Sequence, residues 1–307
     1  MSKNNWQPTA SLPNLKLRAE ILANIHQFFA DRGVLEVDTP LLSAATVTDP
    51  HLHSLVTTKN LYLQTSPEFA MKRLLAAGSG PIYQICKAFR DDEQGRQHNP
   101  EFTMMEWYRP GFNLQDLMRE TDELLQCVLN FPPAEKLTYQ QAFEKYLDIN
   151  PHTAELSELK KRAKDIVGFT DDRDSLLQLL MSQHVEPNLT HTFIYDFPAS
   201  QAALARIRPG NPPVAERVEV YINGMELANG FYELTDAHEQ KQRFLNDLEQ
   251  RKKLGYPAVP HDEHLIAALA HGLPNCSGIA LGIDRLIMIA AKTNNIADVL
   301  SFPIDRA

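Results

Sequence analysis

Two segments rich in apolar and aromatic residues, 82–90 and 101–108, flank a short loop of turn-forming residues. Such a loop predicts that the two segments pair as antiparallel strands. Side chains alternate between the two faces of a strand, so Glu106 and Tyr108 point to the same side of this pair. The chain is therefore expected to build an antiparallel sheet with charged and aromatic groups on one face. The loop residues are Gly95, Asn99 and Pro100.

The rest of the chain supplies helices and further strands around this pair. Apolar residues recur at helical spacing over 15–32, and a strand-like segment over 34–42 is interrupted by Pro40, which suits an edge or an interface. Helical periodicity then dominates from about 114 to 183. This order predicts one α+β domain over 1–307, with an antiparallel sheet, flanking helices and a helical insertion at about 114–183. Further strands are expected at 60–64, 192–196, 216–222, 230–233 and 278–281, and further helices at 66–75, 235–254, 262–271 and from 284.

Composition excludes several classes of protein. The 307 residues carry a net charge of −9, which argues against a protein that coats nucleic acid. No apolar run is long enough for a transmembrane helix, and the N-terminal residues lack a secretory signal pattern. Three widely spaced cysteines disfavour a disulfide framework. We therefore expect a cytoplasmic protein that does not act at a membrane.

Arg90 ends the first strand of the pair, at the start of an acidic loop. An arginine at this position can form a two-point contact with phosphate oxygens. A surface hairpin that carries only weak ion pairs is the competing interpretation.

Three glutamates, Glu219, Glu226 and Glu233, are spaced by seven residues around Asn223-Gly224. If Asn223-Gly224 forms a tight turn, Glu219 and Glu226 face each other across two strands. Opposed carboxylates repel unless a cation lies between them, and Mg²⁺ binds one or two carboxylates together with phosphate oxygens. Exposed acids on an edge hairpin are the alternative.

The segment 278–285, GIALGIDR, has small residues at positions 278, 280 and 282. They clear one face of a strand, so a flat ligand can lie against the backbone, and Arg285 follows in the first turn of a helix. A strand that merely packs in the core would show the same glycines.

Taken together, these stretches resemble the three motifs of class II aminoacyl-tRNA synthetases. FRDDEQGRQHNPEFTMMEWY is similar to motif 2, GIALGIDR to motif 3 and VDTPLL to motif 1. Within that class SPEF, HNPEFTMMEWY, ELANGFYEL and DVLSFP resemble lysyl-tRNA synthetases. Those enzymes carry an N-terminal OB-fold for the tRNA anticodon, whereas only residues 1–13 precede the first predicted helix here. The chain therefore resembles the stand-alone relatives, the elongation factor P–(R)-β-lysine ligases.

The resemblance implies ATP and Mg²⁺ as follows. Arg90 would contact the α-phosphate and Arg285 the γ-phosphate end, as the catalytic residues. Glu219 and Glu226 would hold Mg²⁺. The remaining nucleotide-binding positions implied are Asp91, Asp92, Asn99, Leu227 and Gly282.

The resemblance also implies an amino-acid pocket for (R)-β-lysine or lysine. Glu68, beside Ser66 and Pro67, would bind one ammonium group, and Glu233 and Tyr108 the other, with Glu106 nearby and Ala280 in the floor. A buried ammonium needs carboxylate partners, which favours a dibasic substrate. The activated amino acid would be transferred to a lysine side chain of elongation factor P.

Two positions depart from the family pattern. Asp91-Asp92 stand where Asn-Glu is usual, which affects the expected contact of Asp92 with adenine. Ala280 replaces the glycine of lysyl-tRNA synthetases. A change of this size alters selectivity by roughly 10–200-fold, so we expect Ala280→Gly to shift preference toward α-lysine, as a changed ratio of kcat/KM in pyrophosphate exchange.

Other interpretations remain open at the sequence level. The chain could be a truncated lysyl-tRNA synthetase that uses α-lysine and tRNA, or a non-catalytic paralogue that senses amino acids. His261 and His264 loosely suggest a metal site, but a solvated helix start explains them better. Motif 1 implies a homodimer with its interface near Pro40.

Overall fold

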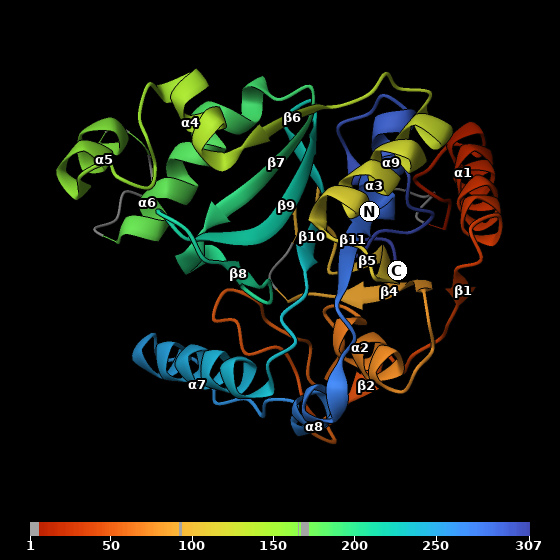
Figure 1. The fold of residues 1–307 in the computed structure, drawn as a ribbon. Helices are drawn as coiled ribbons and strands as arrows, with labels where there is room; N and C mark the ends of the chain where they lie inside the picture. Colours follow the sequence, from red (N-terminus) through yellow and green to blue (C-terminus); the bar gives the residue numbers. More distant parts are fainter. Residues whose placement is uncertain (1–5, 92–93, 165, 167–171) are drawn as a thin grey trace.

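The computed structural model describes residues 6–91, 94–164, 166 and 172–307. Its centre is a mixed sheet in the order β1-β4-β5-β11-β10-β9-β7-β6, with β8 added beside β9 (Figure 1). The six strands from β4 to β7 in this order are antiparallel, as predicted, whereas β1–β4 and β6–β7 pair in parallel. The expected antiparallel sheet thus forms the centre, with one parallel pair at each end. The strands are β1 (Leu35–Glu36), β4 (Ile82–Phe89), β5 (Glu101–Pro110), β6 (Glu135–Thr138), β7 (His191–Pro198), β8 (Ile207–Arg208), β9 (Val214–Ile222), β10 (Met225–Tyr232) and β11 (Cys276–Gly282).

One face of the sheet is covered by α1 (Leu12–Ala30), α3 (Leu114–Leu129) and α9 (Ile283–Ala290). Trp107 on β5 is fully buried there, and Phe29 of α1 stacks on Tyr83 of β4 with 4.5 Å between ring centroids. This is the largest hydrophobic core. It leaves the opposite face of β5, β11, β10 and β9 for polar side chains.

A second core forms from the segment that was expected to be a helical insertion. It contains α4 (Tyr139–Leu147), α5 (Leu156–Ala163) and α6 (Arg173–Leu180), which lie together to one side of the sheet in Figure 1. The segment 114–183 differs from a helical insertion in two ways. It contains the strand β6, which joins the sheet beside β7, and its first helix, α3, packs in the first core rather than in the second. After α6 a π-helical turn (Met181–Val185) and a 3₁₀ turn (Glu186–Asn188) lead back to the sheet.

A third core joins α2 (Glu68–Ala76), α7 (Ala237–Lys253) and α8 (Glu263–Gly272). It includes Ile82 and Tyr108 from the sheet, so α2 lies against the end of β4 and β5. This packing brings the first turn of α2 to the polar face.

The short strand-like segments near the N-terminus differ from the prediction. Instead of one strand over 34–42, β1 forms the sheet edge and β2 (Leu42–Ser43) pairs with β3 (Tyr62–Leu63) in a separate ribbon. Pro40 lies between β1 and β2, where it need not donate to a ladder.

The remaining elements are two 3₁₀ turns, Ala199–Gln201 and Ile296–Asp298. In the part of the chain that the structure covers, we find no helix both long and apolar enough to cross a bilayer.

Candidate functional site

A row of side chains crosses the polar face of the sheet. Glu106 on β5 pairs with Ala280 on β11, Ala280 with Asn229 on β10, and Asn229 with Glu219 on β9. Directly paired residues point to the same face of a sheet. Two acidic groups predicted to bind different ligands therefore lie on one surface, with Ala280 and Asn229 between them.

Gly278 shapes one end of this face. A Cβ atom at this position would overlap the ring of Tyr108 and lie 2.8 Å from Glu233 Oε1. The glycine therefore lets Tyr108 and Glu233 lie against the backbone of β11. Gly282, by contrast, has open space, since the nearest atoms to an added Cβ are those of Arg285 at 3.7 Å.

The Tyr108 end of the face contains a buried charge cluster. The Lys72 ammonium from α2 lies 2.6 Å from Glu68 Oε1 and 2.6 Å from Glu233 Oε2. Burial alone would lower the pKa of Lys72, but the charges of Glu233 and Glu68 raise it above its ordinary value. The sequence analysis identified both glutamates but missed Lys72, although its position four residues after Glu68 on a helix was a usable signal.

Glu106 lies beside this cluster and is fully buried. Ser66 Oγ and Tyr108 Oη each donate a hydrogen bond to its carboxylate, and the Ser66 hydroxyl also accepts from the Glu68 amide. Burial, and then the charge of Glu68, raise the pKa of Glu106 to about 7. Pro67 precedes the first turn of α2 and so helps to begin the helix that carries Glu68.

The other end of the face is also acidic. Asn223 and Gly224 form the predicted two-residue turn with positive φ, but such a turn pairs Ile222 with Met225, so Glu226 pairs with Tyr221 rather than with Glu219. Glu219 and Glu226 are thus diagonal neighbours on one face, not directly opposed as expected. Burial and the charge of Glu219 raise the pKa of Glu226 to about 7.

Glu186 from the 3₁₀ turn joins this acidic end, and sequence reasoning missed it. Tyr221 Oη donates to Glu219 and also lies 3.3 Å from Glu186 Oε1. Burial, Glu219 and Glu226 raise the pKa of Glu186 to about 7. No local pattern marks it, because it lies in an irregular segment that only the fold brings to the sheet.

Three arginines surround the acidic end. Arg285 Nη1 donates to the backbone oxygen of Glu226 at 2.6 Å, and Arg217 forms an ion pair with Glu219. The Arg90 guanidinium lies 5.1 Å from the ring centroid of Phe102. The charges of Arg285, Arg217 and Arg90 all act to lower the pKa of Glu226, so all three lie within electrostatic range of one carboxylate.

Carboxylates at this end fit a bound cation. The part of the chain with assigned structure contains no group of three metal-ligating side chains able to hold an ion alone. Glu226 accepts no side-chain hydrogen bond from any described residue, whereas both oxygens of Glu219 are engaged by Arg217 and Tyr221. A partly buried carboxylate that accepts no side-chain donor suits a cation that arrives with a phosphate ligand.

The remaining residues predicted to bind the nucleotide make different kinds of contact within the protein. Asn99 is buried and joins its own loop to the C-terminal segment, donating to Glu101 O and accepting from the Ile304 amide. The Asp91 amide donates to His53 O, and the Leu227 side chain lies in the main core. Asp92 lies outside the described residues.

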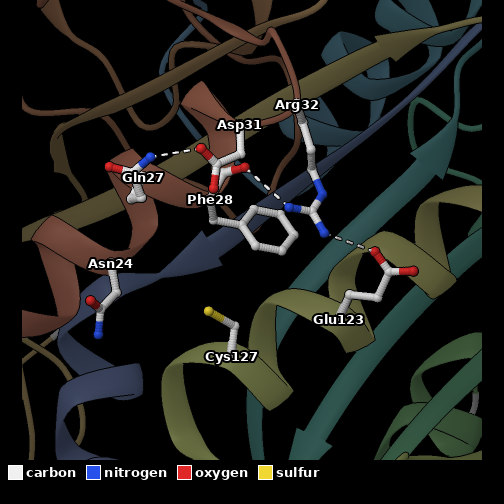
Figure 2. Close-up of a pocket in the computed structure, with 7 residues that line it drawn as sticks. All are labelled: Asn24, Gln27, Phe28, Asp31, Arg32, Glu123 and Cys127. Carbon is white, nitrogen blue, oxygen red and sulfur yellow. Dashed lines mark hydrogen bonds and ion pairs between the residues drawn. The ribbon is translucent and has the colours of Figure 1, made fainter.

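Two surface hollows lie away from this face. The one in Figure 2, about 230 Å³, lies between α1 and α3 in the layer behind the sheet, and Arg32 crosses it, in contact with the Phe28 ring and Glu123. The other contains His261 and His264. There Asp262 accepts the His264 amide as the cap of α8 and His261 pairs with Glu263 at 2.9 Å, in line with a helix start.

Comparison with known proteins finds similar sequences that match nearly the whole chain. A sequence model of the tRNA synthetases of class II (D, K and N) matches residues 7–306. The chain is 55% identical to proteins named elongation factor P–(R)-β-lysine ligase from Salmonella paratyphi B, Salmonella schwarzengrund and Salmonella choleraesuis. Each alignment spans 319 positions and covers 98% of this chain and 98% of the relative.

Proposed function

The chain belongs to the class II tRNA synthetase family (D, K and N), and on this premise we propose that it is an ATP-dependent ligase that activates (R)-β-lysine and transfers it to a lysine side chain of elongation factor P. The observation that carries the proposal is the sheet face with two acidic ends. One end combines carboxylates with arginines, and the other combines carboxylates with a buried tyrosine.

ATP is assigned to the end that carries Glu226. Arg90 would grip the α-phosphate and Arg285 the γ-phosphate end, while Gly282 leaves room for the nucleotide above the strand. Glu226, together with Glu219, would hold Mg²⁺, which neutralises charge on the phosphates and the leaving pyrophosphate. The motif 2 loop would contribute Asp91, Asp92 and Asn99 to the nucleotide site, and the backbone of β10 would contribute Leu227.

The amino acid is assigned to the Tyr108 end. Glu68 and Glu233 would each bind one of the two ammonium groups of a dibasic substrate, and Glu106 would supply a third carboxylate. Ser66 orients Glu106 by its hydrogen bond, and Ala280 lies directly beside Glu106, on the side that faces the metal end. This position directs the substrate carboxylate toward the nucleotide.

The reaction follows from this arrangement. An oxygen of the substrate carboxylate attacks the α-phosphorus of ATP, the bond to the β-phosphate oxygen breaks, and pyrophosphate leaves. A neutral lysine amine of elongation factor P then attacks the acyl carbon of the adenylate, AMP leaves, and an amide bond forms. Positioning and charge neutralisation suffice for both steps, so no side chain needs to be a nucleophile.

We further propose a single catalytic domain that does not read a tRNA anticodon, acts as a homodimer, and works in the cytoplasm alongside the translation factor that it modifies. Motif 1 and the exposed apolar residues near Pro40 support the dimer.

Mass spectrometry of the acceptor tests the function. The protein is incubated with ATP, Mg²⁺ and either (R)-β-lysine or α-lysine, with elongation factor P or tRNA as the acceptor. We expect one added β-lysyl group on a lysine of elongation factor P and no charged tRNA. Aminoacylated tRNA with unmodified elongation factor P would instead identify a lysyl-tRNA synthetase, and no lysine-dependent pyrophosphate exchange would identify a non-catalytic paralogue.

A further inference from the structure

Lys72 is a buried cation inside the proposed amino-acid pocket. Its side chain is 2% exposed, and its ammonium lies 2.6 Å from both Glu68 and Glu233, the two carboxylates assigned to the substrate. Burial of a cation is costly unless it is paired, so this contact is built into the fold. Substrate recognition by carboxylates alone does not explain why the pocket also carries a positive charge.

The charges that face Lys72 come from every element around it. Glu68 lies on α2, Glu106 and Tyr108 on β5, Glu233 after β10 and Cys276 on β11. Burial raises the pKa of Tyr108 and of Cys276, so both stay neutral. Burial raises the pKa of Glu106 to about 7 and that of Glu233 to about 8, so the empty pocket holds protons near neutral pH, and bound ammonium groups favour the ionised carboxylates. With all three carboxylates ionised, the pocket and the Lys72 ammonium have a net charge of minus two.

A pocket charge of minus two balances the two positive charges of an activated dibasic amino acid. Once its carboxylate is joined to AMP, lysine or β-lysine presents two ammonium groups to the pocket. Without Lys72 the same pocket would hold three negative charges against two positive ones, and one carboxylate would need a proton to restore the balance. The third carboxylate, Glu106, is therefore compatible with a dicationic substrate only because Lys72 is present.

We propose that Lys72 is a positioning and specificity-determining residue, which holds Glu68 and Glu233 in place and sets the pocket charge at minus two. The inference rests on the proposed amino-acid ligase function and adds to it a residue that need not touch the substrate. A neutral residue at this position would let the two carboxylates separate and take up protons.

The test replaces Lys72 by methionine, which keeps the length and the helix propensity but removes the charge. In pyrophosphate exchange at saturating ATP, we expect Lys72→Met to raise the KM for the amino acid by about tenfold or more. The KM for ATP should stay within about twofold, because the nucleotide is assigned to the other end of the face. The pH below which the amino-acid KM rises should move up by about one unit or more, because lost positive charge favours protonated carboxylates.

Arg73→Met is the matched control, since it removes one positive charge from the next residue of the same helix, at an exposed position. It should leave both KM values and the pH profile unchanged. A purely structural role for Lys72 predicts less active enzyme with unchanged KM values and an unchanged pH profile, and that result overturns the proposal.

A second variant covers the case in which Lys72→Met does not fold. The double variant Lys72→Met/Glu106→Gln removes one positive and one negative charge, so the sum returns to minus two. It should fold and melt closer to the wild type than Lys72→Met does, and a double variant that is no better than the single one contradicts charge balance. The wild-type assay separates the two hypotheses: no exchange with either lysine isomer refutes the ligase function, whereas exchange with unaltered behaviour of Lys72→Met refutes only the role of Lys72.

Discussion

At the scale of single residues, the site depends on glycines, which leave space beside the strand, as much as on its charged side chains. Gly278 gives the clearest case, because its missing Cβ is the space in which Tyr108 and Glu233 lie. Gly278→Ala should raise the amino-acid KM by about tenfold or more with little change in the KM for ATP.

Gly282→Ala is the matched comparison on the same strand, where an added Cβ has no contact nearer than 3.7 Å. It should melt like the wild type but raise the KM for ATP, if the nucleotide lies on that glycine. Steady-state kinetics with each substrate varied in turn checks both variants. Equal effects of the two variants on both KM values would contradict the assignment of ATP and amino acid to different ends.

Glu106 gives the pocket a pH dependence near neutrality. Burial and Glu68 raise its pKa to about 7 in the empty pocket, so its carboxylate becomes neutral as the pH falls through that value. A neutral carboxyl no longer balances a substrate ammonium, so the KM for the amino acid should rise as the pH falls below about 7. Pyrophosphate exchange over a pH series measures this, and in Glu106→Gln the KM should be higher at pH 8 and depend less on pH. A wild-type KM that is constant between about pH 6 and 8 would refute the assignment.

At the scale of elements, the tight turn of the β9–β10 hairpin determines how the two glutamates of the metal end lie. The two-residue turn places Glu226 opposite Tyr221 and diagonal to Glu219, and the bulge after Glu226 then brings Asn229, rather than Ala228, opposite Glu219. Glu219 is then engaged by protein donors, while Glu226 is left available to a cation. The hairpin therefore offers Mg²⁺ one open carboxylate and one held carboxylate.

This arrangement predicts opposite effects of Glu226 on stability and on activity. The raised pKa of Glu226, about 7, means that its ionisation destabilises the folded protein as the pH rises from about 4.5 to 7. Glu226→Gln should therefore increase the free energy of unfolding by about 1–3 kcal/mol at pH 8 and by little at pH 4.5, while lowering pyrophosphate exchange by about tenfold or more.

Glu216 on the same hairpin provides the contrast. It forms ion pairs with Arg206 at 2.7 Å and with Arg208 at 3.6 Å, so Glu216→Gln should not stabilise the protein at pH 8. Chemical denaturation at both pH values, without nucleotide, measures these effects independently of catalysis. A loss of stability at pH 8 in Glu226→Gln would show that the carboxylate is satisfied within the protein.

Elements with strong local signals could be predicted from the sequence, and those that depend on distant partners could not. The β4–β5 pair, the Asn223-Gly224 turn and the helix expected at 15–32, observed as α1, follow from turn residues and periodicity. The strand β6 was missed because Glu135–Thr138 is short and pairs in parallel with β7 more than 50 residues later. In the same way Glu68 and Glu233 could be found by pattern, whereas Glu186 could not, because only tertiary packing brings its irregular turn to the sheet.

At the scale of the whole molecule, the face is completed by two different cores. The core of α2, α7 and α8 supplies Lys72 and Glu68, and the segment after α6 supplies Glu186. The first core and its helices support the same strands from behind. Mutations that loosen the core of α2, α7 and α8 should therefore affect binding of the amino acid more than binding of ATP. Mutations that loosen the core of α4, α5 and α6 should affect binding of ATP more.

The exposed apolar residues around Pro40 lead to the last prediction, which concerns assembly. Leu35, Leu41, Leu42 and Val56 are 56%, 38%, 45% and 56% exposed, respectively, along β1, β2 and the segment before β3. Several exposed apolar residues in one short part of the chain are typical of an interface, and twofold dimers are the commonest soluble assemblies. We expect light scattering to give twice the chain mass of 34.7 kDa for the wild type, and the single chain mass for Leu41→Glu/Leu42→Glu. Leu254→Glu, at a residue 52% exposed at the end of α7, should remain dimeric. A wild-type protein that is monomeric at micromolar concentration would refute the dimer and leave these residues available to another partner.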